Sequence, residues 1–160
     1  MNKAQIIVMW IGIVLMSLIG CSTTEDEKQQ TSAPTEHEVV STVYEFLRAI
    51  DGGDYDRAIG LGTPNEFKRE GLVKANEVFE LEKAEVIDAY VGNKNAAVLT
   101  NSITIQTGTQ TVQFGFSLIK NGDGWLIRDL DQLLNNEGVQ QWLAGFRSVE
   151  PNAKRVAGDD

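Results

Sequence analysis

The sequence predicts an α+β domain in which about three helices precede a curved antiparallel sheet of four strands, and one more helix follows the sheet. Apolar residues recur at steps of three and four from Val39 to Ile50, as on one face of a helix. From Val112 to Leu118 they instead alternate with small or polar residues, as in a strand. Short turns join the expected strands, and parallel neighbours would need long crossovers, so the sheet should be antiparallel.

Capping signals place three helices in the first half of the domain. The first should begin at the capping box Thr35-Glu36-His37-Glu38 and end at Gly52-Gly53, because glycine readily adopts the left-handed conformation. Asp54 can cap a short second helix, which Gly62 ends. A third helix should open at Thr63-Pro64-Asn65-Glu66, where proline would occupy the first turn.

The second half has the pattern of strands separated by turns. Four strands are expected, at residues 85–91, 96–105, 112–119 and 125–130. The last two are joined by Asn121-Gly122-Asp123-Gly124, a strong hairpin signal. A helix is expected at 136–146, because its apolar residues share one face. The domain should therefore span 35–148, with a flexible tail at 149–160.

Residues 1–20 have the features of an export signal. Lys3 precedes a run from Ile6 to Ile19 that holds only apolar residues, a glycine and a serine. This run is shorter than the ~20 residues that a spanning helix needs. It closes on Leu18-Ile19-Gly20-Cys21, which resembles the lipobox of bacterial lipoproteins. The resemblance implies cleavage before Cys21 and lipid on its thiol; an uncut signal anchor and an ordinary secretory signal are the alternatives.

The segment 21–34 should be a disordered tether, because it contains no large apolar residue that could enter a core. A lipid on Cys21 would make the membrane the first partner of this protein and keep the domain outside the cytoplasm. In a Gram-negative host, Ser22 after the cysteine favours the periplasmic face of the outer membrane. In a Gram-positive host, the domain would lie on the outer face of the cell membrane.

Composition argues against several classes of partner. The formal charge of −9 disfavours nucleic acid, whose phosphates it would repel. Cys21 is the only cysteine, so an internal disulfide cannot form. His37 is the only histidine, and metal sites usually need several histidines, cysteines or clustered carboxylates. We therefore expect no metal and no cofactor.

Two blocks of the domain resemble the NTF2-like superfamily, in its branch of small lipoprotein domains of unknown function. The first runs from Val43 to Ile50 and leads into Gly53–Ala58, and the second runs from Phe116 to Ile127. The resemblance covers about 35–131. It implies a cone-shaped fold in which the sheet curves around the first helix. Members of the superfamily use the pocket between sheet and helices as an active site or a ligand pocket, or for no known purpose.

The resemblance suggests candidate residues for such a pocket. They are Tyr44, Asp88, Tyr90, Phe114 and Phe116. Some members move protons with a buried aspartate and a tyrosine. Asp88 and Tyr90 share one face of a strand, so Asp88 could act as a general base if that face were the interior of the cone. The alternatives are an exposed Asp88 on the outer face, and phenylalanines that only form the core.

Three functions remain open. The preferred one is a non-catalytic, lipid-anchored domain that binds an envelope protein, because the sequence contains no recognisable set of catalytic residues. The second is a binder of a small apolar ligand inside the cone. The third is an enzyme of the isomerase or dehydratase kind that uses Asp88 with Tyr90 or Tyr44.

Overall fold

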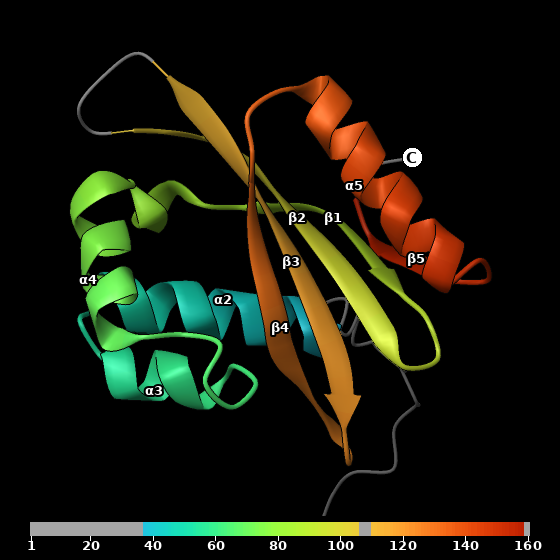
Figure 1. Ribbon diagram of the computed structural model, residues 1–160, viewed down its shortest axis with the longest axis horizontal. Coiled ribbons are helices and arrows are strands. Elements are labelled where there is room, and N and C mark those ends of the chain that lie inside the picture. The colour runs from blue at the N-terminus through green and yellow to red at the C-terminus, as the bar shows by residue number, and fades with distance from the viewer. Residues whose placement is uncertain (1–36, 106–109, 159–160) are drawn as a thin grey trace, which may run out of the picture. The chain divides into compact units, whose positions relative to one another are not determined.

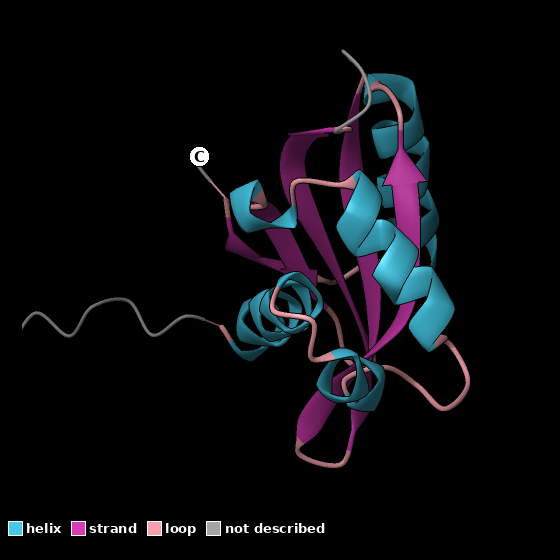
Figure 2. Cartoon of the chain, turned by 90° about the vertical axis from the view of Figure 1, so that its left-hand side faces the viewer, coloured by secondary structure: helices cyan, strands magenta, loops and turns pink. Residues whose placement is uncertain are grey.

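The computed structural model describes residues 37–105 and 110–158, so the predicted signal peptide (1–20), the predicted tether (21–34) and Cys21 lie outside the described residues. The elements in chain order are α2 (Glu38–Asp51), α3 (Tyr55–Gly60), α4 (Arg69–Val78), the 3-10 helix η1 (Leu81–Lys83), β1 (Val86–Val91), β2 (Asn95–Thr104), β3 (Thr111–Asn121), β4 (Gly124–Leu133), α5 (Asn136–Val149) and β5 (Lys154–Ala157). The sheet is antiparallel, in the order β4-β3-β2-β1-β5. Helices lie on both faces of it (Figure 1, Figure 2). The predicted α+β class and antiparallel sheet are confirmed.

The apolar face of α2 forms one half of the main core. The residues of α2 that the periodicity placed on this face are all buried, namely Val39, Val40, Val43, Phe46, Leu47 and Ile50. They pack against inward-facing residues of the sheet, among which Val98, Phe116, Leu118 and Ile127 are completely buried. The alternation predicted for β3 therefore corresponds to its apolar residues facing α2 on the inner side of the sheet.

Bulges in the strands bend the sheet around α2. The register shifts once between β1 and β2, once between β2 and β3, and once between β3 and β4. At the second shift, the buried Thr100 compensates for the interrupted ladder, since its Oγ1 accepts a hydrogen bond from the backbone N of Phe114 at 3.0 Å. Bulges increase the twist and bend of a strand, so these shifts account for the curvature.

Helix α2 begins at Glu38, so the prediction that its cap is Thr35 is wrong, and Thr35 itself lies outside the described residues. His37 is the N-cap residue: its backbone is extended, and its Nδ1 accepts a hydrogen bond from the backbone N of Val39 at 3.4 Å. The only histidine of the chain therefore has a local role at a helix start.

The third predicted helix also begins later than expected, at Arg69 rather than at Thr63. The backbone N of Thr63 donates to the carbonyl of Ile127 at 2.9 Å, and the N of Ile127 donates to the carbonyl of Leu61 at 2.9 Å. This pairing with the edge of β4 keeps the chain out of a helix. Asn65, with φ of +67°, then turns it in the left-handed region.

Helix α5 covers part of the outer face of the sheet. Its Val139 and Leu143 are buried against Leu99 of β2 and Leu133 of β4. Trp142 packs beside them, and its indole Nε1 donates a hydrogen bond to Asp131 at 2.8 Å. Both faces of the sheet are thus covered, the inner one by α2 and part of the outer one by α5.

The predicted flexible tail at 149–160 is wrong for most of its length. Val149 still belongs to α5, and Lys154–Ala157 forms β5, which pairs with β1 and makes the sheet five-stranded rather than four-stranded. An ion pair between Arg155 and Asp88 of β1, at 2.8 Å, joins the two strands. Pairing with a distant strand thus orders a segment that is too short and too polar to be recognised from its own sequence.

Glu150 fixes the turn between β1 and β2 to the end of α5. Its carboxylate accepts hydrogen bonds from the backbone N of Asn93, Lys94 and Asn95, each at 3.1 Å, and from the Asn95 side chain at 2.9 Å. A Cβ on Gly92 would stand 2.4 Å from that carboxylate, so only glycine leaves room for it. These hydrogen bonds, that of the Asn95 side chain first, hold the pKa of Glu150 below its ordinary value.

Replacing Phe46 should test the core. Phe46 is completely buried, and its ring centroid lies 4.8 Å from that of Phe67 and 6.0 Å from that of Phe116. We expect Phe46→Ala to lower the free energy of unfolding, measured with urea, by about 3–5 kcal/mol because it leaves a cavity. Leu134→Ala is the control, because Leu134 is 72% exposed, and it should change that free energy by less than about 0.5 kcal/mol. Similar losses in both variants would contradict this core.

Replacing Glu150 should produce a pH-dependent loss of stability. The lowered pKa means that the ionised carboxylate stabilises the folded state above its ordinary pKa of 4.5, and that this contribution disappears as the pH falls through the folded-state value. Glu150→Gln should therefore lower Tm at pH 7, and the difference from the unaltered chain should shrink in acid. Glu70→Gln, at an exposed position in α4, serves as the control. A difference that stays constant from pH 7 to pH 3 would disprove the carboxylate's role.

Candidate functional site

The predicted pocket residues lie on two different faces of the sheet. Phe114 and Phe116 face α2 in the main core. Tyr44 of α2 packs against the same core, and its hydroxyl accepts a hydrogen bond from the backbone N of Val86 at 3.0 Å. Asp88 and Tyr90 lie on the outer face, where Tyr90 packs on the α5 side. The structure therefore brings Tyr44 together with the phenylalanines, and Asp88 together with Tyr90, in two separate places.

Aromatic rings occupy the space between α2 and the sheet. Phe46 contacts Phe67 and Phe116, the ring of Phe114 lies 6.4 Å from that of Phe116, and the ring of Phe79 lies 5.1 Å from that of Phe114. Four of these five rings are at least nine-tenths buried. The interior of the fold thus carries packed side chains at the positions where the pocket was expected.

On the outer face, Asp88 belongs to a cluster of polar side chains. One carboxylate oxygen pairs with Nε of Arg155 at 2.8 Å, and the other accepts a hydrogen bond from the Tyr90 hydroxyl at 2.9 Å. The guanidinium of Arg147 lies 5.3 Å from the centroid of the Tyr90 ring and donates to its hydroxyl at 3.4 Å. Both oxygens of Asp88 have partners, and the cluster connects β1 to β5 and α5.

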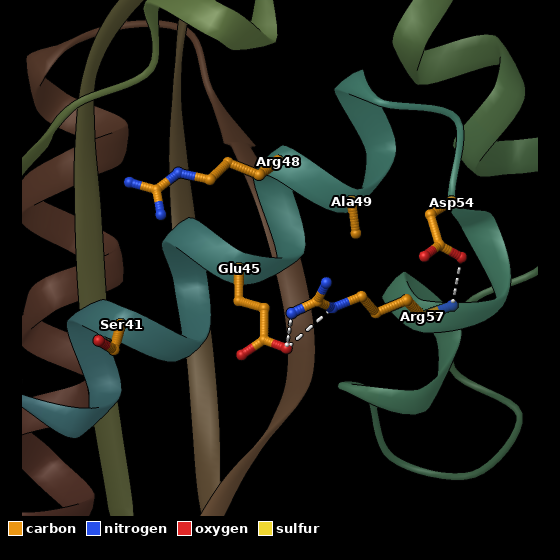
Figure 3. A pocket seen from close by; sticks show the side chains of 6 residues that line it. All are labelled: Ser41, Glu45, Arg48, Ala49, Asp54 and Arg57. Carbon is orange, nitrogen blue, oxygen red and sulfur yellow. Dashed lines mark hydrogen bonds and ion pairs between the residues drawn. The ribbon is translucent and has the colours of Figure 1, made fainter. Parts of the chain in front are cut away.

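A polar hollow of about 450 Å³ lies on the helical surface (Figure 3). Its lining residues come from α2 and the start of α3, namely Ser41, Glu45, Arg48, Ala49, Asp54 and Arg57. Arg57 donates two hydrogen bonds to Oε1 of Glu45, at 3.0 and 2.8 Å, while Asp54 caps α3 by accepting from the backbone N of Arg57. Figure 3 shows the Arg48 side chain directed away from this pair, and its guanidinium lies 5.5 Å from the ring centroid of Tyr44.

A second hollow, of about 310 Å³, lies where α5 meets the outer face of the sheet. We name it the α5 groove. Asn95, Ser117 and Arg128 come from three strands, and Gln141, Trp142 and Phe146 come from the helix. Apolar rings and a cationic side chain therefore face the same space. This combination can recognise a ligand that has both an apolar and an anionic part.

Sequence reasoning missed several residues that organise these surfaces. Arg57 and Glu45 belong to different helices, and Glu150 meets Asn95 from the far end of the domain, so no local pattern shows either pairing. Arg128 is exposed, and the structure shows that it is the extra residue in the bulge between Ile127 and Asp129. The hairpin signal beside it predicted the strand and not the bulge.

Within the described residues, no group of three or more histidine, cysteine, aspartate or glutamate side chains could hold a metal ion. Over the same residues, no helix has the length and apolar character needed to cross a membrane. A comparison with models of protein families and a comparison with curated proteins each gave no match.

Replacing Asp88 should show whether its cluster holds the C-terminal strand. Asp88→Asn removes the ion pair with Arg155, so backbone amides of Lys154–Ala157 should exchange with solvent several-fold faster, while those of β3 keep their rates. Asp123→Asn is the control, since Asp123 lies in an exposed turn. Unchanged exchange in β5 would mean that its backbone pairing alone keeps it in place.

Proposed function

We propose that this chain is a bacterial lipoprotein whose extracytoplasmic domain binds a protein of the cell envelope and catalyses no reaction. The single observation that carries the binding role is that packed aromatic rings occupy the interior, whereas the described hollows open at the surface. A surface that can receive a partner favours protein binding over a small apolar ligand held inside.

The anchor is proposed from the N-terminal sequence. Lys3, the apolar run 6–19 and Leu18-Ile19-Gly20-Cys21 together favour export, cleavage before Cys21 and acylation of its thiol. Each buried methylene contributes ~0.8 kcal/mol, so two or three acyl chains hold a protein far more firmly than one. The domain would lie on the periplasmic face of the outer membrane in a Gram-negative host, or on the outer face of the cell membrane in a Gram-positive host.

We further infer that the domain is NTF2-like. The blocks Val43–Ile50 and Phe116–Ile127 carry the resemblance, and a bent antiparallel sheet packed on α2 is compatible with it. Fold likeness does not assign an activity, because function depends on the residues of a site. Asp88, the candidate general base, has both carboxylate oxygens engaged by Arg155 and Tyr90, which supports a structural role for it.

Purification of the intact lipoprotein from host membranes tests the proposal. We expect the unaltered chain to partition into detergent, to carry the mass of acyl groups, and to co-purify repeatedly with one envelope protein. Cys21→Ser should lose the added mass and the detergent partitioning. Ser22→Ala, which keeps the cysteine, should retain both.

Two results would contradict this function. A Cys21→Ser variant with the mass shift and detergent behaviour of the unaltered chain would remove the anchor from the proposal. A small molecule that repeatedly accompanies the purified chain, in place of a protein, would instead favour a ligand-binding role.

A further inference from the structure

The α5 groove is open because small residues and the position of the helix leave space there. Helix α5 packs on Leu99 of β2 and Leu133 of β4, and in Figure 1 the lower halves of β3 and β4 have no helix in front of them. Trp142 rests on Gly115, where a Cβ would stand 2.8 Å from the indole Cε2. Ser117 is the next outward residue of β3, and Gly145 of α5 has open space where a side chain would be. The rings of Trp142 and Phe146 therefore form one side of the groove, and the small residues Ser117 and Gly145 leave space beside them.

Arg128 is the cation of the groove, and its side chain is exposed. It occupies the bulge of β4, and bulges re-aim side chains at functional positions. Among the described residues its hydrogen-bond partner is the Asn95 amide oxygen, at 3.3 Å, and no carboxylate pairs with it. Arg57, Arg69 and Arg155, by contrast, each pair with an acidic residue.

Hydrogen bonds through Asn95 to Glu150 hold the Arg128 side chain in position. Asn95 accepts from Arg128 through its amide oxygen and donates through its amide nitrogen to the buried Glu150, at 2.9 Å. A side chain oriented in this way loses less conformational entropy when a ligand binds. Asp131 is the one acid among the residues that line the groove, and its Oδ2 accepts a hydrogen bond from the Trp142 indole at 2.8 Å. Arg128 therefore keeps N–H donors for a group outside the chain.

The wall next to Arg128 is apolar. Trp142 and Phe146 are partly exposed there, and Val149, at the end of α5, is 65% exposed. A ligand that fits a space of about 310 Å³ needs its anion and its apolar group close together. The last residue of a polypeptide meets this requirement, since its carboxylate and its side chain are attached to the same carbon.

We propose that the α5 groove binds the carboxyl terminus of a partner polypeptide that ends in an apolar residue. Arg128 pairs with the terminal carboxylate, and the side chain of the last residue packs against Trp142, Phe146 and Val149. Charge-assisted hydrogen bonds from arginine to a carboxylate are among the strong ones in proteins. This inference rests on the proposed function and names the surface and the chemistry of the partner.

Three synthetic tetrapeptides test the proposal against the full-length lipidated chain, labelled with ¹⁵N, in detergent micelles. The first ends in leucine with a free carboxylate, and the second is the same peptide with a terminal amide. The third has a terminal amide and an aspartate before the leucine, so its carboxylate belongs to a side chain. The shift of the Trp142 indole N–H reports occupancy of the groove, and its dependence on peptide concentration gives Kd.

We expect the free carboxylate to bind about tenfold more tightly than either amide, as a charge-assisted pair implies. Arg128→Gln should reduce this ratio to about one. Arg48→Gln, an exposed arginine of α2 outside the groove, should preserve it. Val149→Ser leaves the fold intact, because Val149 is exposed, and it should weaken binding of the leucine peptide.

Equal binding of the free carboxylate and the amide would overturn the proposal, as would an unchanged ratio in Arg128→Gln. Tight binding of the aspartate peptide would assign the groove to an acidic side chain instead of a terminus. If no peptide shifts the indole signal while the lipoprotein still co-purifies with an envelope protein, this inference fails and the proposed function stands. If no protein co-purifies but the carboxylate peptide binds, the proposed function fails and the assignment of the groove to a terminal carboxylate stands.

Discussion

The rest of the structure depends on the burial of one face of α2 against a bent sheet. Phe46 and Phe116 meet at the centre of this contact, where both are completely buried. Bulges give the sheet the curvature that lets the strands from β1 to β4 reach the same helix. Rings fill this side of the sheet, and the hollows found among the described residues lie at the surface.

The outer face is organised by long-range polar contacts rather than by apolar area alone. Glu150 accepts hydrogen bonds from the β1–β2 turn and from the Asn95 side chain. Asn95 then accepts a hydrogen bond from Arg128 at the α5 groove. The same end of the domain carries β5, joined to β1 through Asp88 and Arg155. Residues that stabilise the C-terminal part of the fold therefore also prepare the surface at which we place the partner. In this proposal, Asn95 connects the stability of the fold to recognition at the groove.

Most elements could be predicted because their causes are local. The face of α2, the alternation in β3, the hairpin before β4 and the existence of α5 each arise from neighbouring residues in the chain. The errors occurred where a distant segment decides. Pairing with Ile127 keeps Thr63 out of a helix, and β1 orders Lys154–Ala157 as a strand. The candidate site was less predictable, because the bulges decide which face Asp88 and Arg128 occupy.

By itself, the sequence determined the α+β class and the apolar faces that meet in the core, and its N-terminal pattern is the basis on which export and lipidation are proposed. These are properties of periodicity and of short motifs, which residues close in the chain specify. Only the tertiary structure decided that Asp88 and Tyr90 lie outside the core, that the tail adds a strand, and that Arg128 stands beside the rings of α5. Those outcomes depend on register shifts and on contacts between segments far apart in the chain, which no local pattern records.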